Sequence, residues 1–225
     1  MDLEQAFTFI WKDTEWPKKL GIAALLALTG VGMVGVFGWL GEIARRVAAN
    51  DDNPLPDWSD IGNYFIKGLQ FFGIAVIWSL PAALVVIASS VALTLTATMD
   101  DPGPVIPIMS VFSMCLYVLV FIYIIILNVL SPPLWLLVAE GNSFRTLVNP
   151  RSAWDLFRMN AGSFLIAMLI GWLIVFFLSP LGAVVCLVGA FFTTVLSQTI
   201  MAHLVGQATH QARTHLEDAS EPIIN

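Results

Sequence analysis

Apolar residues run along this chain in long, nearly uninterrupted stretches. Five of them stand out, at residues 20–44, 72–98, 105–130, 163–178 and 181–205. About 20 apolar residues in a helix are needed to cross the roughly 30 Å hydrocarbon core of a membrane. We therefore predict an all-α, polytopic transmembrane helical bundle of four to six crossings.

Prolines inside or beside these stretches predict where the helices end. As one helix, residues 163–205 would be about 65 Å long at 1.5 Å per residue, so the chain must reverse within them, and Ser179–Pro180 is the expected turn. Proline removes a backbone donor and clashes with the preceding turn of a helix. On this basis we expect helix breaks at Pro81, Pro132, Pro133 and Pro180.

Short amphipathic stretches lead into the apolar runs. Within 61–72 an apolar stripe recurs at helical spacing, formed by Ile61, Tyr64, Phe65, Gly68, Leu69 and Phe72. Such a stripe is typical of a helix lying in the membrane plane. Weaker stripes occur near the N-terminus and around residues 154–164. Tryptophan favours the headgroup level of a membrane, which makes Trp11, Trp16, Trp58 and Trp154 the expected interfacial anchors.

The segment "NPLPDWSD", residues 53–60, interrupts the apolar pattern between the first two runs. We call it the elbow. Its prolines and acidic residues predict a bend that delivers the chain onto the amphipathic stretch after it. We interpret the elbow as a structural element first and as a docking surface second.

Composition supports a membrane protein. Hydrophobic residues make up 58% of the 225 residues and charged residues only 12%, whereas soluble domains carry about 25% charged residues. The net charge of −6 argues against nucleic acid as a partner. The expected partners are the lipid bilayer and other membrane subunits or a second copy. We expect a single integral membrane domain over 1–216 and an acidic tail over 217–225.

The positions of the ten lysines and arginines leave two orientations open. If all five runs cross the membrane, seven basic residues share one face and three lie on the other. If residues 20–44 enter and return, with a bend at Thr29–Gly32, all ten share the cytoplasmic face. Both alternatives place the C-terminus in the cytoplasm.

Chemically active constellations are scarce. We find no nucleophile–base set and no metal-ligand spacing, so we expect no enzymatic activity, metal or cofactor. His203 and His210 lie seven residues apart, hence on one helical face, and are the candidates for a haem or pigment ligand. The best candidate for a functional feature is a basic cluster on one membrane face, which would attract anionic lipid headgroups. It is formed by Arg45, Arg46, Lys67, Arg145, Arg151 and Arg158.

The first third of the chain resembles an uncharacterised prokaryotic membrane family, domain of unknown function 4013. The matching residues are Asp13 and Trp16, Gly38 to Arg46, Pro56 to Asp60, and Phe65 to Leu69. Trp39 departs from the tyrosine expected after that glycine. The layout is similar to the membrane domain beside some glycerophosphodiester phosphodiesterases. The resemblance implies a prokaryotic origin, and we therefore expect the protein in the inner membrane. It implies no particular activity and identifies no catalytic residues.

The resulting functional hypothesis is a non-enzymatic scaffold or accessory subunit of a membrane complex, or a lipid-organising protein. One alternative is a small-molecule or lipid transporter that uses proline-broken helices and a polar cavity at Asn128, Thr94 or Gln198. Another is a pigment- or haem-binding subunit.

Overall fold

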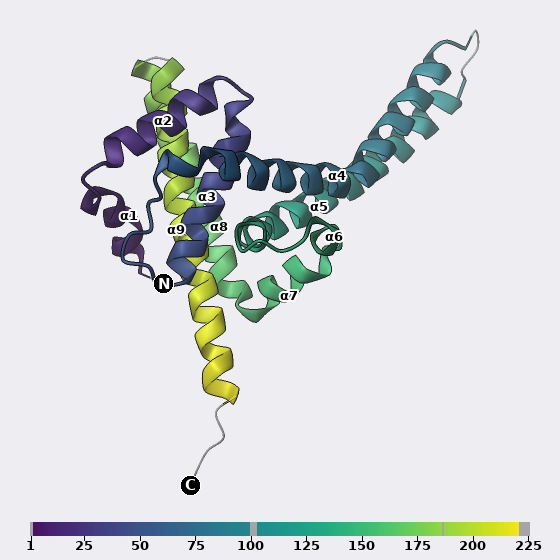
Figure 1. Cartoon of the computed structure of the whole chain (residues 1–225). Helices are drawn as coiled ribbons and strands as arrows, with labels where there is room; N and C mark the ends of the chain where they lie inside the picture. The colour runs from purple at the N-terminus through teal and green to yellow at the C-terminus, as the bar shows by residue number, and fades with distance from the viewer. Residues whose placement is uncertain (1, 100–102, 186, 221–225) are drawn as a thin grey trace. The chain divides into compact units, whose positions relative to one another are not determined.

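The computed structural model describes residues 2–99, 103–185 and 187–220, and these are almost entirely helical. The elements are α1 (Leu3–Lys12), α2 (Trp16–Leu28), α3 (Gly32–Ala48), a 3-10 turn (Trp58–Asp60), α4 (Ile61–Ala97), α5 (Val105–Ala139), α6 (Phe144–Leu147), α7 (Arg151–Met159), α8 (Ala161–Val185) and α9 (Leu187–Ser220) (Figure 1). Within the described residues, four helices are long and apolar enough to cross a membrane: α4, α5, α8 and α9. The predicted all-α, multi-pass architecture is confirmed.

The chain forms two compact units, which we describe separately. The first unit contains Met1–Ile74 and Leu130–Asn225, and the second contains Ala75–Val129. Helices α4 and α5 each contribute to both units. The acidic tail expected at 217–225 falls largely outside the described residues.

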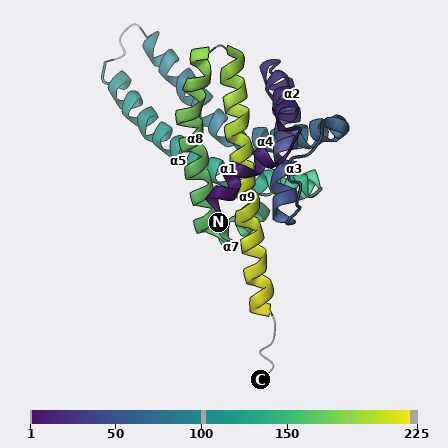
Figure 2. The same ribbon diagram turned by 90° about the vertical axis from the view of Figure 1, so that its left-hand side faces the viewer.

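Helix α9 is the centre of the first unit, because α1, α2, α3 and α8 all pack against it (Figures 1 and 2). Its inward face is made of small and branched residues without solvent exposure, among them Ala202, Leu204, Val205 and Ala208. Small side chains allow helix axes to approach closely. At Gly206 α9 comes close to α3, since an added Cβ would lie 2.5 Å from Val47 Cβ and 2.6 Å from the backbone oxygen of Ala44.

The first apolar run, 20–44, is two helices and not one. Helix α2 ends at Leu28, and Gly30 takes a positive φ of 73° that glycine tolerates without strain. The Thr29 hydroxyl donates to the Leu26 carbonyl oxygen at 2.7 Å and accepts from the Gly32 amide at 3.0 Å. This threonine therefore ends α2 and caps α3, and the chain bends where the second orientation places its bend.

Helix α3 packs directly on residues 61–74 of α4 through glycines. A Cβ at Gly38 would collide with the Tyr64 carbonyl oxygen, and a Cβ at Gly68 would collide with the Val34 carbonyl oxygen. Each glycine thus lies against the backbone of the opposite helix. A backbone oxygen cannot swing aside as a side chain can, so this crossing requires glycine on both helices.

The second unit consists of the C-terminal part of α4 and the N-terminal part of α5. Within it, the Tyr123 hydroxyl donates to the Trp78 carbonyl oxygen at 2.7 Å and joins the two helices. We call this unit the apolar hairpin, residues 75–129. Most of its side chains are exposed, and only 11% of the most apolar stretch of α5 is buried.

The predicted helix breaks at proline are wrong. Pro81 lies inside α4, Pro132 and Pro133 lie inside α5, and Pro180 lies inside α8. In hydrocarbon the backbone has no water to bond with, so a helix that loses one internal hydrogen bond still keeps the others. Proline therefore does not end these helices as it does in soluble proteins.

Two further expectations about helix boundaries need correction. The reversal expected at Ser179–Pro180 occurs about six residues later, between α8, which ends at Val185, and α9, which begins at Leu187. The amphipathic stretch 61–72 is not a separate helix, because α4 continues from Ile61 to Ala97. Part of its stripe faces α3 instead of a membrane surface: Tyr64 is buried and Gly68 touches α3, whereas Leu69 is exposed.

The glycine crossing yields a test with a matched control on the same helix. Gly68→Ala should lower the free energy of unfolding by about 3 kcal/mol, because the new methyl group meets the α3 backbone. Gly62→Ala has nothing within 4 Å of the added Cβ and should raise stability by about 0.5–1 kcal/mol. Thermal unfolding of both variants in mild detergent checks this, and equal midpoints would contradict the crossing.

Candidate functional site

Four backbone carbonyl oxygens of the elbow accept hydrogen bonds from side chains of the surrounding helices. The donors and acceptors are Arg46 Nη1 to Asn53 (3.3 Å), Lys19 Nζ to Leu55 (2.9 Å), Trp39 Nε1 to Pro56 (3.0 Å) and the Tyr64 hydroxyl to Asp57 (2.9 Å). These donors come from α2, α3 and α4. The elbow is therefore held in place from three sides, and its predicted structural role as a bend agrees with this arrangement.

Lys19 is the most deeply placed charge of this arrangement, with a side chain only 11% exposed. Its ammonium lies 2.7 Å from Asp13 Oδ2 and 3.0 Å from Asp57 Oδ1. Burial alone lowers the pKa of Lys19, but the hydrogen bonds and charges of the two carboxylates outweigh burial and raise that pKa above its usual value. Lys19 therefore stays charged and ties the start of α2 to the elbow.

Two tryptophans complete the anchoring of the elbow. The indoles of Trp39 and Trp58 stack with ring centroids 5.3 Å apart and an interplanar angle of 14°. Nε1–H of Trp58 donates to the Lys19 carbonyl oxygen at 2.9 Å. Trp58, expected as a membrane anchor, is half-buried, and its hydrogen bond joins the elbow to α2.

A second polar cluster surrounds Glu42 on α3, and we call it the Glu42 cluster. The carboxylate is 8% exposed and lies 2.6 Å from Arg45 Nη2, 3.3 Å from Arg46 Nε and 3.1 Å from Lys67 Nζ. Burial raises the pKa of Glu42, but the hydrogen bonds and charges of Arg45 and Lys67 prevail and lower it to about 2. Lys67 also donates to the Ala139 carbonyl oxygen at 2.9 Å, so the cluster joins α3 and α4 to the end of α5.

The predicted basic cluster is only partly assembled around one point. Arg45, Arg46 and Lys67 meet at Glu42, and their charge is partly neutralised there. Arg145 lies on α6 and Arg151 on α7, while Arg158 of α7 pairs with Asp155 at 2.9 Å. A common membrane face for all six residues stays a prediction.

The other expected anchors are found on short helices. Trp11 on α1 is 58% exposed and packs edge-to-face on Trp16, with centroids 4.5 Å apart. Trp154 on α7 is 45% exposed and stacks on Phe157. These exposed rings are compatible with the interfacial role predicted for them, and that role stays a prediction.

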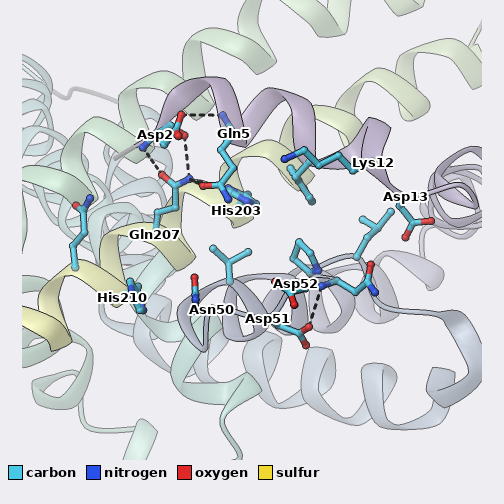
Figure 3. Close-up of a pocket in the computed structure, with 16 residues that line it drawn as sticks. Asp2, Gln5, Lys12, Asp13, Asn50, Asp51, Asp52, His203, Gln207 and His210 are labelled. Atoms are coloured by element: carbon cyan, nitrogen blue, oxygen red, sulfur yellow. Dashed lines mark hydrogen bonds between the residues drawn. The ribbon is translucent and has the colours of Figure 1, made fainter.

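A polar cavity of the first unit lies between α1, residues 50–55 and α9, and has a volume of about 350 Å³ (Figure 3). We call it the α1–α9 cavity. Its walls are largely polar, and the residues that shape its chemistry are Lys12, Asp13, Asp51, Asp52, His203 and His210. A volume of this size lies at the lower end of the range for small-ligand sites.

Both candidate histidines line this cavity, and both are engaged with the protein. His203 is 2% exposed and stacks on Phe9, with ring centroids 4.3 Å apart. Nδ1 of His210 lies 3.1 Å from the Ala48 carbonyl oxygen, which only accepts, so Nδ1–H is the donor. Within the described residues no group of three or more His, Cys, Asp or Glu side chains is placed to hold a metal ion.

The polar residues proposed for a transporter lie elsewhere and bond locally. The Asn128 amide donates to the Ile124 carbonyl oxygen and the Thr94 hydroxyl to the Ser90 carbonyl oxygen, each one helical turn back and at 2.8 Å. Gln198 Oε1 on α9 is buried without a partner among the described residues. None of these three side chains lines the α1–α9 cavity.

Sequence reasoning missed the central role of two residues. In the sequence Lys19 is only one of the ten basic residues that bear on orientation, and Glu42 stands one turn before Arg45 and Arg46, where a local ion pair explains it. A signal did exist for both, because a charged residue within or beside an apolar run is expensive unless it is paired. The contact from Glu42 to Lys67, 25 residues away, has no counterpart in the local pattern.

The Glu42 cluster predicts a specific acid sensitivity. A carboxyl group whose pKa falls from 4.5 to about 2 on folding stabilises the fold by about 3 kcal/mol at neutral pH. That contribution is present above about pH 4.5 and is lost as the pH falls toward 2. Glu42→Gln should therefore lower stability by a similar amount at pH 7 and flatten the loss of stability between pH 4.5 and 2.

Asp155→Asn is the matched control for this test. It removes one charge from an ion pair whose side chains are 61–63% exposed, so it should change stability by about 0.5 kcal/mol or less. Thermal unfolding in detergent across this pH range measures both variants. Identical pH profiles for wild type and Glu42→Gln would refute the assigned role.

Comparison with known proteins identifies the family of this chain. A family model described as "Protein of unknown function (DUF4013)" matches residues 21–198, from α2 to the first part of α9. No curated protein and no solved structure matches the chain. The match extends well beyond the first third, where the resemblance was recognised, and leaves Asp13 and Trp16 just before it. The chain therefore belongs to the DUF4013 family of proteins of unknown function.

Proposed function

We propose that this protein is a non-enzymatic scaffold or accessory subunit of a membrane complex. The observation that carries the proposal is the apolar hairpin, residues 75–129. Two long helices here present exposed apolar side chains on most sides, from Leu84 and Ile87 on α4 to Val111 and Phe121 on α5. Lipid would be enough to cover such a surface, but only packing against another helix would bury it through specific contacts.

The use of the polar residues supports the same proposal. Three polar side chains are deeply buried and form their hydrogen bonds with other parts of the same chain: Lys19, Trp39 and Glu42. Residues arranged in this way hold helices in position.

The orientation that we propose places all ten basic residues in the cytoplasm of a prokaryotic cell, together with the C-terminus. Helices α2 and α3 have 13 and 17 residues, or about 20 and 26 Å, each shorter than the roughly 30 Å hydrocarbon core. This supports an entry and return of residues 20–44, with four crossings by α4, α5, α8 and α9. The inner membrane follows from the same argument, because the basic residues accumulate on one side.

Cysteine labelling from each side of the membrane tests the orientation. In a Cys115→Ser, Cys186→Ser background, Lys18→Cys and Ser59→Cys flank the α2–α3 pair, and both side chains are exposed in the wild type. Both cysteines should react with an impermeant maleimide only in inverted vesicles, and Met99→Cys only in whole spheroplasts. Labelling of Lys18→Cys and Ser59→Cys from opposite sides would mean a single crossing.

Native mass measurement tests the scaffold role. The protein purified from its own membrane in mild detergent should carry a second polypeptide, or a second copy, in fixed ratio. Ala83→Trp and Ser90→Trp add bulk to exposed small positions two helical turns apart on the hairpin and should reduce that complex about tenfold, a cost of about 1.4 kcal/mol.

Val184→Trp provides the control for these substitutions, because Val184 is 85% exposed and lies on α8, outside the hairpin. It should leave the complex intact. A lone chain that carries only lipid would contradict the scaffold role and favour lipid handling or transport. A visible absorption band in the purified protein would instead favour the pigment-binding alternative at His203 or His210.

A further inference from the structure

The α1–α9 cavity contains two opposite charges that have no internal partner. Lys12 of α1 lines one wall, and within the described part of the chain its ammonium forms no ion pair or hydrogen bond. Asp52 lies on the segment across from it (Figure 3) and likewise forms none among the described residues. Both side chains belong to exposed residues, so neither charge is required for folding.

His203 adds a buried donor to the wall that Lys12 forms. The Asp2 amide donates to Gln207 Oε1 at 2.9 Å and the Asp2 carbonyl oxygen accepts from Gln207 Nε2 at 3.0 Å, which fixes the orientation of this amide. Gln207 Nε2 is therefore a donor, and it lies 3.4 Å from both Gln5 Oε1 and His203 Nδ1. We assign Nδ1 as an acceptor, because an N–H there would point at this donor.

This assignment leaves the proton of neutral His203 on Nε2. Among the described residues Nε2–H has no acceptor, although His203 is only 2% exposed. Nε2 is not one of the fully enclosed polar atoms that lack a partner, so it keeps contact with the open space of the cavity that His203 lines. A bound group with an anionic oxygen would satisfy it, beside the positive charge of Lys12.

The remaining carboxylates of the cavity are already used as acceptors by the protein itself. Asp2 accepts from the backbone amide of Gln5, Asp13 accepts from the ammonium of Lys19, and Asp51 accepts from the backbone amide of Asn53. Asp52 is thus the carboxylate that remains for a ligand. An anion alone would meet the four carboxylates unfavourably, and a cation alone would leave Lys12 and His203 without a counterpart.

A ligand that carries both charges satisfies both walls, and we propose that the α1–α9 cavity binds a phosphoethanolamine group. Its phosphate oxygens accept from Lys12 and from Nε2–H of His203, and its ammonium donates to Asp52. Hydrogen bonds between charged groups are roughly twice as strong as neutral ones. This inference goes beyond the scaffold role and does not depend on it.

The position of the cavity points to a membrane lipid as the source of that group. On the other side of α1 lies an apolar groove of about 410 Å³, bordered by α1, α8 and α9. On α9, Ile200 lines the groove and His203 lines the cavity one turn later. The groove shows that an apolar surface borders α1 beside the cavity. A phosphatidylethanolamine molecule would bring its headgroup to the cavity with its acyl chains in the bilayer, whereas free phosphoethanolamine would use the cavity alone.

Lipid binding to the delipidated protein in detergent tests the proposal by native mass spectrometry. Phosphatidylethanolamine should bind at least tenfold more tightly than phosphatidylglycerol, which has no ammonium, and than phosphatidylcholine, whose ammonium has no N–H. Lys12→Met and Asp52→Asn should each weaken phosphatidylethanolamine binding at least tenfold. Lys18→Met and Asp155→Asn remove the same charges from exposed pairs outside the cavity and should not.

His203→Phe tests the ring donor, because it keeps a ring against Phe9 and removes Nε2–H, together with the Nδ1 contact to Gln207. It should weaken binding as well, with thermal unfolding midpoints recorded for every variant to show that each is folded. Equal affinity for phosphatidylethanolamine and phosphatidylglycerol would overturn the proposal, as would equal losses in the Lys12 and Lys18 variants. If soluble phosphoethanolamine binds with the same dependence on Lys12 and Asp52 and the lipid does not, the cavity assignment holds and the lipid source is wrong.

Discussion

Leu55 and Pro56, in the middle of the elbow, are buried beside apolar helices, so their carbonyl oxygens need donors from the protein. An unpaired buried carbonyl group costs free energy comparable to a lost hydrogen bond. Lys19, Trp39 and Tyr64 supply these donors from three different helices. Because each donor has to reach one particular carbonyl oxygen, the elbow fixes where α2, α3 and α4 lie relative to one another within the first unit.

The glycine crossing and the Glu42 cluster depend on that arrangement. Only when α3 lies against α4 at Gly38 and Gly68 does Lys67 come within 3.1 Å of Glu42. The residues that carry the resemblance to the family, from Gly38 to Arg46 and from Pro56 to Leu69, therefore belong to one structural assembly. This gives the family resemblance a physical meaning, since these residues specify how the helices pack.

Hydropathy predicted the helices well because burial in a membrane depends on composition along a local window. The bend within 20–44 was also available from the local pattern, since Gly30 and Thr29 have turn chemistry of their own. The partners of the polar residues could not be predicted from the local pattern. Lys19 bonds to Leu55, 36 residues away, and Lys67 bonds to Ala139, 72 residues away. The proline breaks failed for another reason: rules from helices in water were applied to helices in hydrocarbon.

The central place of α9 has a consequence for biosynthesis. Helices α1, α2 and α3 precede α9 by well over a hundred residues, yet all three pack on it. At about 5–20 residues per second, a ribosome needs about ten seconds or more to add that length of chain. During this time residues such as Ala6, Leu20 and Ala44, fully buried in the finished unit, lack their final neighbours. The N-terminal helices therefore need temporary cover from lipid, an insertase or a chaperone until α9 enters the membrane.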